Sequence, residues 1–513
     1  MNNRKRFFRD GVMLTVVGLS MRSVGMLFGA FVTRAVGAEG IGVYTLMMTV
    51  YSFAVTFATA GISLSVTRLV AASVGDGDGL RVKGILRAAF LYSLIFSFVG
   101  SVALFFGADL LSLRILGVGD CAKAFRVLSL SLPPMAASSV IVGYFIGVKR
   151  VRHNALSQIA SQLFKVLLTV ALISSASGDG VYDAIFALSL GTLITELLTF
   201  LLLICEYVFD LKKHPLYAEE DTSAKLSKMA RHTLPLALSQ YVRNALLSLE
   251  HILIPKRLVH RGQSTAEAYS DYGILHGMAL PTVIFALSPL TSFSGLLVPE
   301  FAECDSLGRD RRMSLIATEA LNATLGYSFA VMTVLCLFSE ELGLVLYGSH
   351  DAARYIAVLA PVVPIMYLDH VTDSMLKGVG EQVYSMWVNI TDSFLSVILV
   401  WVLIPPLGIY GYALVIIIME AYNFILSFIR LGKRIRFRIY PVRSILLPVI
   451  SSFASVKLSS LIFVGTGKSV GFFWLVMKIV FVGASFVFSM TLLTALLKLI
   501  SPKLKSLHGT EKA

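Results

Sequence analysis

Long apolar stretches recur along almost the whole chain and are separated by short polar loops. They lie near residues 11–35, 41–70, 84–107, 122–147, 155–176, 183–206, 233–258, 271–299, 315–339, 354–378, 383–404, 410–431, 443–465 and 471–499. An apolar run of roughly 18 residues or more can cross the hydrocarbon core of a bilayer as a helix. The pattern predicts an all-α polytopic membrane protein with fourteen transmembrane helices. The first stretch is too long for a signal peptide, so it is expected to stay as a helix.

Composition and charge support this prediction and add an orientation. The 513 residues are 56% hydrophobic and 15% charged, with a net charge of +13. Alternate loops, counted from the N-terminus with their flanks, hold 28 Lys and Arg, whereas the intervening loops hold 8. Positive residues concentrate on the cytoplasmic side of membrane proteins, so both termini are expected there. The basic run at 433–438 then predicts attraction to anionic membrane lipid and gives no reason to expect nucleic acid as a partner.

The longest inside loop, 207–230, is the one plausible linker, and it follows six spans. Shifting the sequence by 222 residues places Arg9 on Arg231, and shifting it by 231 places Gly42 on Gly273. A chance alignment of apolar helices is the alternative explanation. We predict two parallel six-helix lobes, an N-lobe at 1–206 and a C-lobe at 231–431, followed by helices 13–14 and a cytoplasmic tail at 432–513.

Proline positions predict local breaks in three of these spans. Proline removes a backbone donor and kinks or ends a helix. The residues concerned are Pro133 and Pro134 in span 4, Pro281 and Pro289 in span 8, and Pro361 and Pro364 in span 10.

Eight ionisable residues lie well inside the predicted spans. They are Arg22, Lys165, Glu196, Arg243, Glu250, Asp369, Asp392 and Glu420. A charge at the bilayer centre costs about 2.5–3.5 kcal/mol, so eight facing lipid would cost on the order of 20 kcal/mol. These side chains are therefore expected to face a hydrated cavity or one another.

Helical spacing places several polar side chains on shared faces. On span 5, Gln158 and Lys165 follow one face with Gln162 beside them, and on span 7 Gln240 and Arg243 lie three apart. Guanidinium groups bind phosphate with two parallel hydrogen bonds and stay charged. We predict a substrate-binding cavity. Its candidate residues are Arg22, Arg243, Lys165, Gln158, Gln162 and Gln240. A structural pair, such as Lys165 with Glu196, is the alternative for the cations.

The carboxylates inside the spans have two possible roles. They could bind a coupling Na⁺ or H⁺, or they could serve as counter-ions for the arginines. These residues are Glu196, Glu250, Asp369, Asp392 and Glu420. No bound cofactor or metal site is expected, because no P-loop and no His/Cys cluster with ligand spacing occurs. The chain shows no catalytic motif, and we do not expect an enzyme.

Several segments carry a family resemblance. The stretch TRAVGAEGIGVY at 33–44, LIPKRL at 253–258, GMALP at 277–281 and LVPE at 297–300 resemble the polysaccharide flippases related to stage V sporulation protein B. That family belongs to the multidrug/oligosaccharidyl-lipid/polysaccharide exporter superfamily. The resemblance covers about the first 430 residues.

The resemblance implies transport of an undecaprenyl-pyrophosphate-linked oligosaccharide, such as the peptidoglycan precursor lipid II, across the bacterial cytoplasmic membrane by alternating access. By position, Arg22 and Arg243 are the residues that would engage the pyrophosphate. The implied partners are this lipid-linked substrate, the membrane lipids and the cell-wall synthesis machinery, in sporulation or in vegetative growth.

Three other functions stay open at this point. A cation-coupled multidrug exporter of the same superfamily is disfavoured, because the first span carries Arg22 and no mid-membrane carboxylate. A polytopic glycan polymerase or ligase is disfavoured by the short outer loops. A scaffold in a sporulation or division complex would leave a similar hydropathy pattern.

Overall fold

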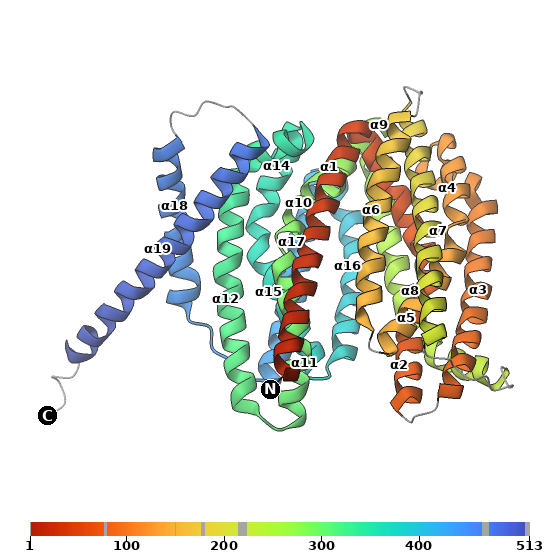
Figure 1. The fold of residues 1–513 in the computed structure, drawn as a ribbon. Helices are drawn as coiled ribbons and strands as arrows, with labels where there is room; N and C mark the ends of the chain where they lie inside the picture. The colour runs from red at the N-terminus through yellow and green to blue at the C-terminus, as the bar shows by residue number, and fades with distance from the viewer. Residues whose placement is uncertain are drawn as a thin grey trace. The chain divides into compact units, whose positions relative to one another are not determined.

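The computed structural model describes residues 2–75, 79–148, 150–175, 180–213, 223–463 and 471–507, and every regular element within them is a helix (Figure 1). Helices end or break where glycine adopts a left-handed backbone. Gly37 has φ 78° inside the first helix, and Gly61 has φ 74° where the next helix begins. Glycine adopts this conformation at no steric cost, which side chains with a Cβ cannot do.

Within the described ranges, eleven helices are long and apolar enough to cross a membrane, and a further pair bent by 60° raises the number to twelve. One of the eleven, Ser20–Ser73, has 54 residues and contains the breaks at Gly37 and Gly61. The chain is thus a multi-pass membrane protein. The predicted count of fourteen stays a prediction.

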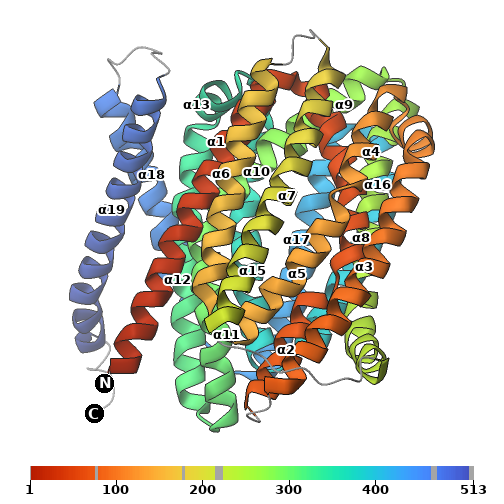
Figure 2. The same cartoon turned by 45° about the vertical axis from the view of Figure 1, so that its right-hand side comes forward.

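The chain forms two compact units. The first comprises residues 1–14, 31–273 and 397–409. Its elements are the two ends of α1 (Asn2–Thr59), at 2–14 and 31–59, α2 (Ile62–Gly75), α3 (Gly79–Leu110), η1 (Leu111–Leu116), η2 (Gly119–Cys121), α4 (Ala122–Ser129), α5 (Leu132–Gly147), α6 (Val151–Ser175), α7 (Val181–Lys213), α8 (Ser223–His260) and α9 (Thr265–Gly273). In Figures 1 and 2, α6 and α7 run side by side.

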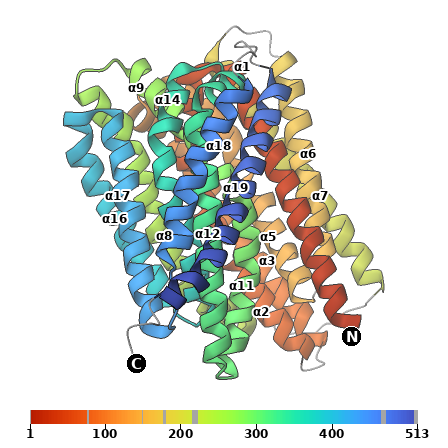
Figure 3. The same ribbon diagram turned by 90° about the vertical axis from the view of Figure 1, so that its left-hand side faces the viewer.

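The second unit comprises residues 15–30, 274–396 and 410–513. Its elements are the middle part of α1 at 15–30, η3 (Ile274–Ala279), α10 (Leu280–Phe285), α11 (Ser288–Ser306), α12 (Asp310–Leu337), α13 (Ser339–Leu342), η4 (Gly343–Tyr347), α14 (His350–Leu359), η5 (Ala360–Val362), α15 (Val363–Gly378), most of α16 (Gln382–Leu407), α17 (Ile409–Arg434), η6 (Val442–Leu446), α18 (Leu447–Phe463) and α19 (Phe472–Leu507). Figure 3 shows α18 and α19 packed along each other.

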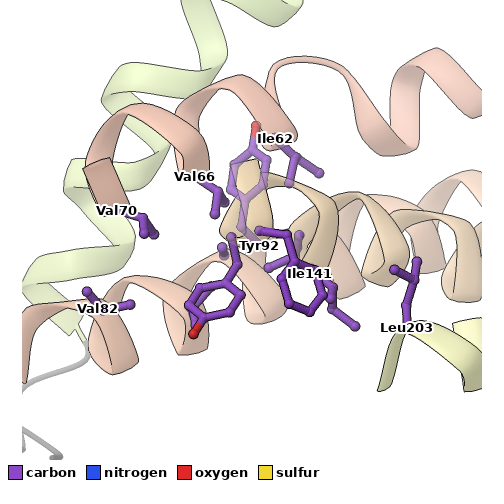
Figure 4. Packing of buried hydrophobic residues seen from close by; sticks show 12 residues of the cluster. Ile62, Val66, Val70, Val82, Tyr92, Ile141 and Leu203 are labelled. Carbon is purple, nitrogen blue, oxygen red and sulfur yellow. The ribbon is translucent and has the colours of Figure 1, made fainter. Parts of the chain in front are cut away.

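The core of the first unit is built from β-branched and aromatic side chains on neighbouring helices. Val66 and Val70 of α2 meet Val82 of α3 and Ile141 of α5, each at most 1% exposed (Figure 4). Gly143 of α5 allows this approach, because a Cβ there would lie 2.7 Å from the carbonyl oxygen of Ser63. Small residues bring membrane helices close enough for tight van der Waals packing.

The compact units group the helices differently from the predicted lobes. Helix α8 lies with the first unit, and the end of α16 joins it there. One contact explains the latter: the Arg257 guanidinium lies 3.2 Å from the ring centroid of Trp401 and donates to its carbonyl at 3.3 Å. The predicted division at 207–230 stays a prediction, and residues 214–222 of that linker lie outside the described residues, as does the end of the tail at 508–513.

Proline breaks the helices where the sequence predicts it. Pro133 and Pro134 stand in the first turn of α5, directly after α4 ends. Pro289 stands at the start of α11, at the 60° bend from α10. At the first turn the missing N–H of proline has no intrahelical partner to lose, so these positions begin a helix.

Candidate functional site

Arg22 in α1 is an exposed cation held by a hydroxyl group. Its Nη1 donates to Ser288 Oγ at 3.2 Å, and Ser288 donates in turn to the Phe285 carbonyl at 2.6 Å. Ser288 lies at the bend between α10 and α11, so the break in the helix places its hydroxyl beside α1. His370 of α15 lies close enough to Arg22 for the two side chains to interact electrostatically. Within the described residues Arg22 is thus oriented by a hydroxyl group and forms no ion pair with a carboxylate.

An apolar cavity of about 500 Å³ lies next to Arg22, because the following residue, Ser23, is part of its lining. Its lining comes from α1, α10, α12, η4 and α19, with few polar atoms. The residues include Ser23, Met26, Leu27, Phe285, Tyr327 and Phe472. A cavity of this size is typical of ligand sites, which combine apolar walls with a few placed polar groups. The second unit thus puts a guanidinium group beside an apolar cavity.

Three of the predicted carboxylates gather in the second unit. Asp369 of α15, Asp392 of α16 and Glu420 of α17 interact electrostatically, and Ser427 hydrogen-bonds Asp369. The Oδ1 atom of Asp369 is buried and has no hydrogen-bond partner within the described part of the chain. Like charges held together inside a bundle need protons or a cation to neutralise them.

The first unit brings Lys165 of α6 and Glu196 of α7 together. Both are half-buried, and their charges interact. Tyr51 also lies near Glu196, and its hydroxyl is 2.6 Å from Ser131 Oγ. This is the arrangement that the alternative of a structural pair predicts for Lys165.

The other α6 candidates differ in their exposure. Gln162 is half-buried and Gln158 is exposed. Both lie on the helix that carries Lys165, as the spacing predicts.

Helix α8 positions the remaining candidates. Gln240 and Arg243 are exposed, whereas Glu250 is buried and lies near Tyr272. Neighbouring side chains fix the helix, because Asn244 donates to Thr56 Oγ1 and Tyr241 donates to the Phe57 carbonyl at 3.1 Å.

The structure therefore separates the predicted residues into groups. Arg22 belongs to the second unit and Arg243 to the first, so their sharing one chamber stays a prediction, as do the roles of all the candidate residues. Sequence reasoning missed Ser288, His370 and Tyr51. Ser288 stands directly before Pro289, and that position at a helix start was the available signal.

Comparison with known proteins identifies families and relatives that this chain resembles. The model of the family described as "Polysaccharide biosynthesis protein" matches residues 7–304, and the MatE model matches residues 277–402. Stage V sporulation protein B of Bacillus subtilis (strain 168) is 25% identical over 422 residues, which are 81% of this chain and 81% of that protein. The lipid II flippase MurJ of the same strain is 20% identical over 487 residues, which are 88% of this chain and 87% of that protein.

A solved structure agrees in fold. The inward closed conformation of a lipid II flippase MurJ superposes with a TM-score of 0.70 at 12% identity, covering 95% of this chain and 99% of that one. The first family model spans more than half of the residues. The chain belongs to the polysaccharide biosynthesis protein family of membrane transporters.

Proposed function

We propose that this protein is a flippase that moves an undecaprenyl-pyrophosphate-linked oligosaccharide across the bacterial cytoplasmic membrane. The observation that carries the proposal is the exposed Arg22 guanidinium, held by Ser288 at the edge of an apolar cavity of about 500 Å³. Such a substrate joins a strongly anionic pyrophosphate to an apolar chain. The Arg22 guanidinium suits the pyrophosphate, and the apolar cavity suits the chain. The names of the relatives support lipid II or a related glycan as the cargo.

The proposed mechanism follows from the free-energy cost of moving the polar part of the substrate through the hydrocarbon of the bilayer. A pyrophosphate and its sugars cannot cross hydrocarbon unaided, because charges and unsatisfied polar groups are costly there. Fourteen crossings arranged as two lobes, with both termini in the cytoplasm, would allow the cavity to open to one side and then to the other. Arg22 and Arg243 would hold the pyrophosphate while the apolar chain stays in contact with lipid.

The carboxylate cluster supplies a candidate for coupling. In this proposal Asp369, Asp392 and Glu420 take up Na⁺ or H⁺, because three like charges at this site favour a neutralising cation. An Asp369→Asn variant would then lose the dependence of transport on the ion gradient while retaining substrate binding. Transport of the variant in vesicles with and without each gradient identifies the ion.

A cation-coupled drug exporter is the second candidate, and the MatE match at 277–402 favours it. The two functions differ in cargo. An exporter would lower the accumulation of lipophilic cations in cells, and Arg22→Ala would improve or leave unchanged the handling of such cations. A flippase leaves their accumulation as it is.

Complementation tests the proposal in cells. Expression in a strain depleted of its lipid-linked oligosaccharide flippase should restore growth. Arg22→Ala and Arg243→Ala should fail at equal protein levels, and Arg22→Lys should restore growth in part, because lysine keeps the charge and loses the planar fork. Arg311→Ala, an exposed arginine of α12, is the matched control. Full growth with both the Arg22→Ala and the Arg243→Ala variant would contradict the proposal.

A further inference from the structure

The chain that follows α17 forms an extended strap, residues 435–440, along one face of α12. Three polar side chains of α12 hold its backbone. Thr318 Oγ1 accepts from the Arg438 N–H at 3.1 Å, and Ser314 donates to the Arg436 carbonyl. The amide of Asn322 accepts from the Tyr440 N–H at 3.1 Å and donates to the Arg438 carbonyl at 3.0 Å.

Four residues along α12 and two residues along the strap cover nearly the same distance, so the hydrogen bonds between them can repeat. The α12 residues are spaced by four, and a helix rises about 6 Å over that interval. The strap residues 436, 438 and 440 are spaced by two, and an extended chain covers about 6.6 Å over that interval. The strap is therefore fixed in register by side chains more than a hundred residues away in the sequence.

This register decides where the side chains of the strap point. Successive residues of an extended chain face opposite sides. Ile435 is 3% exposed, and the Phe437 ring packs on Phe428 with centroids 5.0 Å apart. Arg436 and Arg438, which alternate with them, are exposed. The strap thus buries its apolar residues and presents its arginines.

The cations around the strap fall into two groups. Arg430 and Arg434 both pair with the single carboxylate of Glu381, at 2.8 and 2.7 Å. Lys433, Arg436, Arg438 and Arg443 are exposed, and within the described ranges they form no ion pair with a carboxylate. Four unpaired positive charges therefore lie within eleven residues of chain.

The strap connects the ends of two candidate membrane spans, Ile409–Arg434 and Val442–Phe463. This places it at the level where a helix leaves the hydrocarbon. Exposed Tyr440, Val442 and Leu446 lie beside the cations, at 47%, 45% and 52% exposure. Tyrosine is enriched at the membrane–water interface, and exposed aliphatic residues next to it contact acyl chains. A partner of this surface has to offer negative charge and apolar chains together.

We propose that the strap is a docking site for the phosphate head groups of anionic phospholipids in the adjoining leaflet. Arg436 and Arg438 bind the phosphate oxygens, with Lys433 and Arg443 on either side. The α12 residues fix the spacing of the two guanidinium groups before any lipid arrives, which removes part of the ordering cost of binding. None of these four cations lines the cavity beside Arg22, and the site does not depend on the transported substrate.

Binding of defined lipids to the purified full-length protein in neutral detergent tests this site. The probes are phosphatidylglycerol and phosphatidylcholine with a fluorescent acyl chain. A juxtamembrane cation contributes a factor of about five to binding, so Arg436→Gln with Arg438→Gln should weaken phosphatidylglycerol binding about 25-fold. Replacing both by lysine should preserve most of it. Phosphatidylcholine should bind weakly to every variant.

Two further variants separate a built site from general attraction. Arg309→Gln with Arg311→Gln removes the same charge from exposed residues near the start of α12 and should change binding less than threefold. Asn322→Ala keeps every cation but loosens the strap, and it should weaken binding several-fold. Equal loss in the Arg309/Arg311 variant, or full binding by the Arg436/Arg438 variant with an unchanged thermal midpoint, would overturn the proposal.

Discussion

Replacing Gly42 by alanine should force apart two helices of the first unit. Gly42, in the part of α1 that follows the Gly37 break, packs against the backbone of α9. A Cβ at Gly42 would lie 1.9 Å from the Tyr269 carbonyl oxygen, and one at Gly273 would lie 2.3 Å from the Ala38 carbonyl oxygen. Ordinary contacts of this kind begin at 3.4 Å. The methyl group of Gly42→Ala therefore requires a separation of about 1.5 Å, and backbone cannot rotate away as a side chain can.

The energetic cost follows from overpacking. Inserting a methyl group into such a contact costs about 1–3 kcal/mol. If this contact closes one side of the protein during alternating access, the same energy shifts the balance between the two states by roughly 5- to 150-fold. The variant should favour the state in which these helix ends are apart.

Distances between spin labels measure this shift. Labels at Ala35 and Ala266, both exposed in the first unit, report the separation after the four native cysteines are replaced. Gly42→Ala should increase the long-distance population. Gly29→Ala in the same helix is the matched control, because a Cβ there meets nothing within 4 Å. Identical distance distributions for Gly42→Ala and the parent would refute this account of the contact.

Two other predictions concern charge pairs. Hydrogen bonds from Arg430 and Arg434 hold the pKa of Glu381 below its ordinary value, so this carboxylate stabilises the fold above its unfolded pKa and loses the effect as pH falls through its folded pKa. Glu381→Gln should therefore lower the thermal midpoint at neutral pH and flatten its fall as the pH drops below the ordinary glutamate pKa of 4.5, and equal slopes for variant and parent would exclude the pair as the cause. Lys165→Met should destabilise the protein by about 1–3 kcal/mol, more than a double variant with Glu196→Leu, since a single change leaves one charge unpaired. Thermal unfolding in detergent compares the two, and a larger loss in the double variant would show that the charges do not compensate each other.

Hydropathy was sufficient to predict the helical elements. The predicted span at 183–206 corresponds to α7 (Val181–Lys213), and the one at 410–431 to α17 (Ile409–Arg434). The thickness of the bilayer sets the length of each spanning helix, so each helix can be predicted from its own stretch of sequence. Proline breaks could be predicted for the same reason, as Pro289 at the bend before α11 shows.

Contacts between distant segments could not be predicted in this way. The bond from Arg22 to Ser288 joins residues 266 positions apart, and it depends on how α1 packs against a broken helix. The strap on α12 is similar, because Ser314, Thr318 and Asn322 form an ordinary polar stripe until the partner is known. The sequence offers a Lys165–Glu196 pair as one alternative, since both residues lie deep in predicted spans where an unpaired charge is costly, and this role stays a prediction.

Translocation in reconstituted vesicles tests the central claim most directly. Vesicles contain a fluorescent undecaprenyl-pyrophosphate oligosaccharide, and an impermeant reagent quenches the outer leaflet. The parent protein should expose the inner pool to the reagent, Arg22→Ala and Arg243→Ala should slow this at least tenfold, and Arg311→Ala should leave the rate unchanged. Equal rates for the parent and for both the Arg22→Ala and the Arg243→Ala variant, or no transport by the parent for any such lipid, would contradict the account.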